Sequence, residues 1–133
     1  MAAFKSYQDL KVWQDAVSLV ESVYRITSGF PAEDRFGLTS QIRRAAVSVP
    51  SNIAEGHARS SARDFMRHLA ISRGSLAELE TQILIAHRIG YLSADHMEEL
   101  ASDCDQIGKM LRGLLKSLNT KVLPPPAHQS PRP

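Results

Sequence analysis

The chain has 133 residues, with 16 lysines and arginines against 14 aspartates and glutamates, and a single cysteine. This length allows one domain with its own hydrophobic core, and one cysteine excludes an internal disulfide framework and a cysteine-based zinc site. No apolar run approaches the roughly 20 residues that cross a bilayer, and the first residues lack the pattern of a signal peptide. We therefore expect a cytoplasmic protein that does not enter the membrane.

Positive charge is concentrated in the middle of the chain. Residues 35–75 contain seven arginines and only two acidic residues, whereas the rest of the chain has more acidic than basic residues. This distribution predicts a basic face and hence an anionic partner. Arginine also serves well in internal ion pairs, so a structural role for some of these side chains remains an alternative.

The first predicted helix covers residues 7–27 and carries two neighbouring apolar stripes. One stripe contains Leu10, Trp13, Val17, Val20, Tyr24 and Thr27, and the other contains Val12, Ala16, Leu19, Val23 and Ile26. Two stripes predict contacts with more than one neighbour, either inside a bundle or across a subunit interface. Pro31 then prevents the helix from continuing.

The second predicted helix covers residues 36–57 and contains a proline. Pro50 removes one backbone hydrogen bond and crowds the carbonyl of Ala46, which predicts a kink. We expect the freed carbonyl to be hydrogen-bonded by Ser48, Ser51 or Asn52.

Two further helices are predicted at residues 62–89 and 94–122. Ser60 or Ser61 is the expected N-cap of the first and Ser93 that of the second, and Gly90 separates them. The last helix has heptad spacing over Met97, Leu100, Cys104, Ile107, Leu111, Leu114 and Leu118. The pattern predicts an all-α, antiparallel up-down four-helix bundle over residues 1–122, followed by a proline-rich disordered tail at residues 123–133.

Antiparallel pairing of the second and third helices about a turn near residue 60 brings small residues together. Gly74 is expected to face Ala46, so that the two backbones approach closely beside Pro50, which is expected to face Ala70. The same register predicts ion pairs of Arg43 and Arg44 with Glu78 and Glu80, and of Glu55 with Arg63. Glu55 is therefore expected to be a structural carboxylate.

The segment "SVPSNIAEG", from Ser48 through Gly56, resembles a motif of proteins encoded in intervening sequences of bacterial 23S ribosomal RNA genes. The resemblance extends over residues 4–118. The matching positions are Arg43, Arg44, Pro50, Ser51, Asn52, Glu55, Gly56, Gly74, Ser75, Glu78 and Glu80. Asp64 departs from the family, which usually has glutamate there.

This resemblance implies a four-helix bundle that assembles as a ring-like homopentamer. The family is similar to the accessory variability proteins of diversity-generating retroelements, which are basic pentamers that bind nucleic acid and a reverse transcriptase. It therefore implies self-association, RNA or DNA as a partner and, by family analogy only, a reverse transcriptase.

The arginines supply the candidate nucleic-acid-binding surface. Arg59, Arg63 and Arg67 share one face if the third helix extends back to residue 59, and Arg44 and Arg73 belong to the same basic region. Such residues bind phosphates without reading sequence. A solvated basic face is the alternative. Most of the eight aromatic residues fall on predicted core stripes, so no platform for stacking bases is expected.

Catalytic and metal-binding patterns are not evident. The five histidines never fall at ligand spacing, Cys104 occupies a core position, and "GHARSSARD" lacks an oxyanion-hole signature. We expect no enzyme activity, cofactor or metal, and a scaffold that binds nucleic acid. The alternatives are a protein–protein interaction scaffold without nucleic-acid binding and, more weakly, an enzyme with a site around Asn52 and Glu55.

Overall fold

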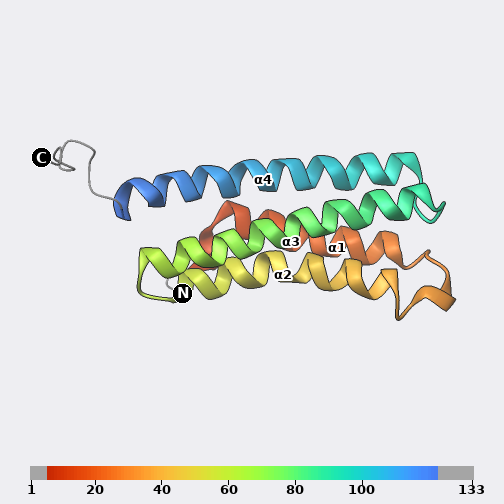
Figure 1. Ribbon diagram of the computed structural model, residues 1–133, viewed down its shortest axis with the longest axis horizontal. Helices are drawn as coiled ribbons and strands as arrows, with labels where there is room; N and C mark the ends of the chain where they lie inside the picture. Colours follow the sequence, from red (N-terminus) through yellow and green to blue (C-terminus); the bar gives the residue numbers. More distant parts are fainter. Residues whose placement is uncertain (1–5, 123–133) are drawn as a thin grey trace, which may run out of the picture.

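Four long helices lie side by side and run alternately up and down the molecule (Figure 1). The structure, a computed structural model, describes residues 6–122. Its elements are η1 (Tyr7–Asp9), α1 (Lys11–Thr27), η2 (Ala32–Asp34), α2 (Leu38–Ala58), α3 (Ala62–Arg88) and α4 (Ala94–Val122). No strand occurs within this part of the chain, and the predicted all-α, antiparallel four-helix bundle is confirmed. The predicted tail at residues 123–133 lies outside the described residues.

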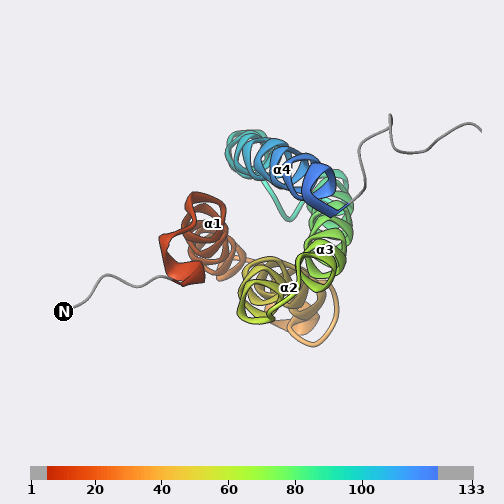
Figure 2. The ribbon, with the colours of Figure 1, turned by 90° about the vertical axis from the view of Figure 1, so that its left-hand side faces the viewer.

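The helices follow one another around the bundle in chain order, so that α4 returns beside α1 (Figure 2). One of the two apolar stripes of α1 supplies the core, and the heptad positions of α4 face it. The buried residues on these two helices are Val12, Ala16, Leu19, Val23, Ile26, Leu100, Cys104, Ile107, Leu111 and Leu118. Most of the second stripe of α1 is only partly buried, because it lies at the edge of this core. At its C-terminal end Thr27 is buried and Tyr24 is exposed.

The predicted boundaries of the last two helices hold within one residue, whereas α2 begins at Leu38 and leaves the predicted first residue, Phe36, in the preceding turn. Ser61 and Ser93 cap α3 and α4 through their hydroxyls, which accept hydrogen bonds from the N–H groups of Asp64 and His96. Gly90 has a φ of 88°, the left-handed conformation that ends a helix. Near the N-terminus, however, Leu10 is extended, so that η1 and α1 are separate.

Helix α2 continues through Pro50, which is buried. The polar groups expected to bind the carbonyl of Ala46 are engaged elsewhere or exposed. Asn52 Nδ2 donates to the carbonyl oxygen of Ser48 at 3.0 Å, the Ser48 hydroxyl lies 2.7 Å from that of Ser75, and Ser51 is exposed. That expectation was wrong, because Ser48 binds Ser75 of α3, Asn52 binds Ser48 and His68, and Ser51 points to solvent. The kink at Pro50 stays a prediction.

The antiparallel pairing of α2 with α3 is as predicted, but the position of closest approach is different. Gly74 is exposed, and a Cβ added to it would meet no atom within 4 Å. A Cβ at Gly56 would instead lie 2.5 Å from the Cβ of His68. The expected contact of Gly74 with Ala46 was therefore wrong, because Gly74 points to solvent while the buried Gly56 admits the α3 backbone. Ala70, expected opposite Pro50, is exposed as well.

Candidate nucleic-acid interface

A groove of about 480 Å³ lies between α3 and α4, near the end of the bundle where α4 finishes. We call it the basic groove. Its lining residues are Arg63, Met66, Arg67, Ala70, Arg73, Leu115 and Asn119. Three of the seven described residues that line it carry a guanidinium and none carries a carboxylate, so the groove is suited to an anion.

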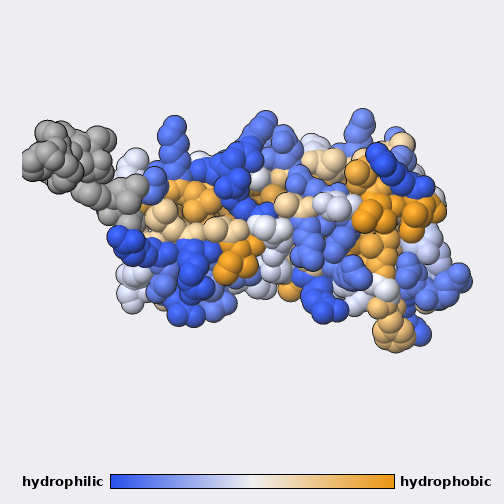
Figure 3. Space-filling view, viewed as in Figure 1, coloured by the Kyte–Doolittle hydropathy of each residue, from blue (hydrophilic) through white to orange (hydrophobic). Residues whose placement is uncertain are grey.

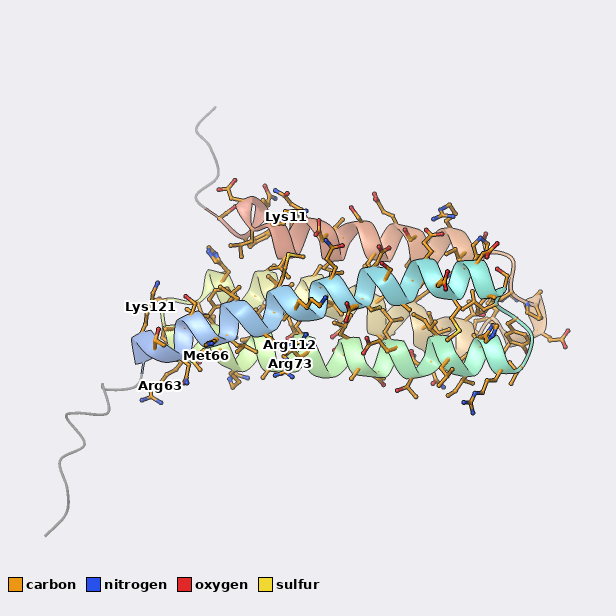
Figure 4. All side chains as sticks on the ribbon, turned by 90° about the horizontal axis from the view of Figure 1, so that it is seen from above. Lys11, Arg63, Met66, Arg73, Arg112 and Lys121 are labelled. Carbon is orange, nitrogen blue, oxygen red and sulfur yellow. The ribbon has the colours of Figure 1, made fainter. Side chains whose placement is uncertain are left out.

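The guanidinium groups of the basic groove come from α3, and cationic residues of α4 lie in the helix half beside it. Arg63, Arg67 and Arg73 lie in the first half of α3, and residues 106–122 of α4 contain four cationic residues and no acidic one. Antiparallel packing places these halves side by side. In Figure 4, Arg63 and Lys121 lie at the end of the bundle where α4 finishes, and Arg73 and Arg112 lie next to each other nearer its middle. The α4 cations were missed in the sequence, although the run of Lys109, Arg112, Lys116 and Lys121 was a visible signal.

The floor of the basic groove is apolar. Met66 and Leu115 are partly buried and pack against the hydrophobic core. On the surface, apolar side chains form a strip between α3 and α4 that hydrophilic side chains flank (Figure 3). Such a floor lowers the local dielectric constant, so a phosphate held by the surrounding guanidinium groups is bound more strongly than on a fully solvated surface.

The arginines of the groove differ in how much they are engaged. Arg67 lies 4.0 Å from a carboxylate oxygen of Asp64, and its Nη2 lies 3.2 Å from Nε2 of His68. Within residues 6–122, no ion pair involves Arg63 or Arg73. These two side chains are therefore available to an external anion.

A chain of hydrogen bonds through the buried His68 positions Arg67. Arginine has no acceptor, so Nε2 of His68 must accept from Arg67, and Nδ1 then donates to Oδ1 of Asn52 at 3.1 Å. The amide of Asn52 is oriented by its donation to Ser48. Nε2 of His68 also lies 3.9 Å from a carboxylate oxygen of Glu55, which is beyond hydrogen-bond distance.

A smaller hollow of about 140 Å³ shares Arg73 with the basic groove and marks where the excess of positive charge ends. Arg73 and Arg112 line this hollow together with Glu80 and Asp105, which neutralise the local charge. Cys104 also lines it and is fully buried, and burial raises the pKa of its thiol to about 12. A thiol that stays protonated at neutral pH is a core residue and not a nucleophile.

The predicted helical stripe of Arg59, Arg63 and Arg67 was wrong. Arg59 follows the last residue of α2 in an extended conformation, and α3 begins only at Ala62. Its guanidinium lies 3.0 Å from Glu55, so Glu55 pairs with Arg59 and not with Arg63 as expected. The turn between the helices breaks the periodicity on which the stripe depended.

The partners expected for Arg43 and Arg44 were also wrong in part. Nε of Arg43 donates to the Thr27 hydroxyl at 2.9 Å, and its guanidinium lies 4.5 Å from the centre of the Tyr24 ring, so Arg43 binds α1. Arg44 and Glu78 do line one groove of about 440 Å³ between α2 and α3, but no ion pair joins them.

Glu80 faces α4 from the small hollow beside Arg73, on a different side of α3 from Arg43 and Arg44. Of the five arginines predicted to bind nucleic acid, the structure therefore gathers Arg63, Arg67 and Arg73 in one groove. It separates Arg44 and Arg59 from that groove.

The residues around the suggested enzyme site are occupied with internal contacts. Asn52 binds Ser48 and His68, and Glu55 binds Arg59. Over residues 6–122, no group of three or more histidine, cysteine or acidic side chains is placed to hold a metal ion. In the same range, no helix is both long and apolar enough to cross a membrane.

The fold and the groove define a class: an antiparallel four-helix bundle with an arginine-rich surface between its last two helices. The chain belongs to the 23S rRNA-intervening sequence protein family, whose family model matches residues 8–113.

One solved structure has the same fold, a protein of unknown function from the S23 ribosomal protein family of Bacteroides thetaiotaomicron. The two share 24% sequence identity with a TM-score of 0.74, over 79% of this chain and 95% of that one. No curated protein shows significant similarity to the chain.

Proposed function

We propose that this protein is a non-catalytic scaffold that binds the phosphate backbone of RNA or DNA through the basic groove. The observation that carries the proposal is the lining of that groove, which has three guanidinium groups and no carboxylate among the described residues. Guanidinium groups bind phosphate oxygens through paired N–H donors. The contacts are largely independent of sequence, since they are made to the backbone.

Self-association is part of the proposal. Four large apolar side chains on α3 and at its C-terminal end are exposed to solvent, namely Ile71, Leu84, Ile85 and Ile89. Apolar side chains gather at the end of the bundle opposite the basic groove, where α3 finishes (Figure 3). A homopentamer of the kind implied by the family resemblance would repeat the basic groove five times and so bind a long nucleic acid with avidity. We place this assembly in the cytoplasm.

The same exposed apolar side chains favour a second candidate function, a protein–protein interaction scaffold without nucleic-acid binding. In that case the outer face of α3 would receive a partner protein, and the arginines would be solvated. A reverse transcriptase is such a partner by family analogy only. The two functions differ in salt dependence, because binding to phosphates weakens steeply as salt rises whereas apolar docking does not.

The test replaces Arg63, Arg67 and Arg73 together by glutamine. Binding to a 30-base-pair random duplex and to a structured RNA is measured by fluorescence anisotropy between about 50 and 200 mM salt. If each arginine neutralises one phosphate, the slope of log affinity against log salt becomes shallower by roughly 2 to 3 in the triple variant. Light scattering establishes whether the assembly is unchanged.

A matched control removes the same charge elsewhere: Lys11, Arg25 and Arg88 replaced by glutamine. These three exposed side chains do not line the basic groove. If both triple variants lose the same affinity for nucleic acid, the loss is due to net charge alone. That result would contradict binding at the basic groove. Absence of binding by the wild type at 50 mM salt would reject nucleic-acid binding and favour the protein scaffold.

A further inference from the structure

A second hollow, of about 430 Å³, lies between α1 and α2 at the start of α2. We call it the aromatic hollow. Its lining residues are Tyr24, Arg35, Phe36, Ser40, Arg43, Arg44 and Val47. Three of these described residues are arginines and none is acidic, so the aromatic hollow is positively charged like the basic groove.

Two aromatic rings of this hollow are exposed, although Tyr24 falls on one of the apolar stripes predicted for the first helix. Phe36 is 86% exposed and Tyr24 is 44% exposed. The guanidinium of Arg35 lies 4.9 Å from the centre of the Phe36 ring, and that of Arg43 lies 4.5 Å from the centre of the Tyr24 ring. One face of each ring therefore carries an arginine. The exposure of Phe36 leaves most of its ring free to receive another flat group.

Hydrogen bonds within the chain fix the guanidinium of Arg43 at the aromatic hollow in the absence of a ligand. Arg43 donates to the Thr27 hydroxyl at 2.9 Å, and that hydroxyl donates in turn to the carbonyl of Val23 at 2.7 Å. The nearby carboxylate of Asp34 accepts a hydrogen bond from the N–H of Leu38 at 3.3 Å, so it is engaged with the first residue of α2. A fixed guanidinium loses little conformational freedom on binding an anion.

We infer that the aromatic hollow binds a single-stranded stretch of nucleic acid. A base stacks on the exposed face of Phe36, and Arg35, Arg43 and Arg44 contact the adjoining phosphates. Exposed aromatic faces beside arginines are the means by which proteins hold unpaired bases, since each base has a flat π-face. A duplex keeps its bases stacked on one another, so this hollow distinguishes single strands from duplexes. An acidic peptide would use the arginines but not the ring of Phe36.

The aromatic hollow and the basic groove are separate sites. Phe36 precedes α2 and Arg63 follows it, and the 21 residues of α2 make a helix about 30 Å long. The connection between α1 and α2 lies at the opposite end of the bundle from the connection between α2 and α3 (Figure 1). The inference rests on the proposed function for the class of ligand, but different residues carry it and different variants test it.

The test compares Phe36→Ala with the wild type on three probes: a labelled 15-nucleotide oligothymidylate, the same strand with abasic sites throughout, and a 30-base-pair duplex. The first two probes have the same backbone charge and differ only in their bases. Loss of one stacked base is expected to weaken binding of the oligothymidylate by about 5- to 100-fold. Binding of the abasic strand and of the duplex is expected to stay unchanged. Phe36→Tyr should restore the oligothymidylate affinity because it keeps the ring.

Tyr7→Ala is the matched control, since it also removes an aromatic ring, and Tyr7 is half-buried beside Trp13 and lies outside the aromatic hollow. Unchanged oligothymidylate binding by Phe36→Ala would overturn the inference, as would an equal loss on the abasic strand. A change of oligomer mass in Phe36→Ala without a change in strand affinity would assign the ring to a contact between copies and also overturn it.

The Arg63, Arg67 and Arg73 variant separates this inference from the proposed function. If that variant loses duplex binding while Phe36→Ala alone loses single-strand discrimination, both sites are supported. If duplex binding is unaffected by the triple variant but Phe36→Ala loses the oligothymidylate, the basic groove fails and the aromatic hollow stands.

Discussion

The two long interfaces of α3, with α2 and with α4, differ in the kind of contact that holds the helices together. Against α2, α3 makes hydrogen bonds from buried or half-buried side chains: Ser75 with Ser48, Ser72 with the carbonyl of Val49, and His68 with Asn52. Against α4, no hydrogen bond between side chains crosses the interface within residues 6–122, and the contact is made by buried apolar residues. The first interface is specified by polar geometry and the second by apolar shape.

This difference separates the residues that hold the helices together from those that are proposed to bind a ligand. The motif "SVPSNIAEG" supplies most of the α2 side of the polar interface, and its groups are engaged within the molecule. The α4 interface leaves its polar residues at the outer edge, where Arg63 and Arg73 remain available to a ligand. The residues with the most specific sequence pattern are therefore structural, whereas the proposed binding residues have only a weak pattern.

The largest expected effect is that of Gly56→Ala. The new Cβ would lie 2.5 Å from that of His68, so α2 and α3 must move apart, at a cost of about 2 to 3 kcal/mol in the free energy of unfolding. Gly108→Ala is the control in the α4 interface, because its nearest contacts would be 3.4 and 3.5 Å, and we expect a change below about 1 kcal/mol. Urea denaturation measures both. Equal effects would show that the two interfaces are packed alike.

A smaller loss is expected for Ser72→Ala. Ser72 is fully buried and its hydroxyl donates to the carbonyl of Val49 at 2.8 Å, a contact worth about 1 kcal/mol. Thr81→Ala removes a similar hydroxyl bond on the exposed side of α3 and should change the unfolding free energy by less than about 0.5 kcal/mol. If thermal unfolding does not distinguish the two variants, the polar interface contributes no more than a surface hydroxyl.

Gly74→Ala should act in the opposite direction. Gly74 lies inside α3 and an added Cβ would meet nothing within 4 Å, so the gain in helix propensity should stabilise the protein by about 0.5 to 1 kcal/mol. The melting temperature, measured by circular dichroism, should rise. A fall would mean that Gly74 packs against something outside the single chain, such as another copy.

The smallest effect concerns the interface of α1 with α4. Burial, and then the charges of Glu99 and Asp15, raise the pKa of Asp103 above its ordinary value. Its ionised form therefore destabilises the fold above the raised pKa, and this cost disappears as the pH falls through it. Asp103→Asn should stabilise the protein slightly at pH 7, by less than about 0.5 kcal/mol, and not at pH 3. A benefit independent of pH would exclude the charge as the cause.

The sequence by itself determined the fold class, because the apolar periodicity of four segments and the capping residues Ser61 and Ser93 act locally. It determined the core positions of α4, including Cys104, for the same reason. The basic character of residues 63–73 was also visible, since charge can be counted along the chain.

Only the tertiary structure decided which of these charges act together. The rotation of α3 about its own axis turned Gly74 outward, and that of α2 turned Gly56 inward. The extended residue Arg59 broke the expected stripe. The cations of α4 joined the arginines of α3 because antiparallel packing brings distant segments to one end. Phe36 and Tyr24 are exposed because they lie near helix ends, where no neighbouring helix covers them. Contacts between segments far apart in sequence depend on angles and distances that local periodicity does not contain.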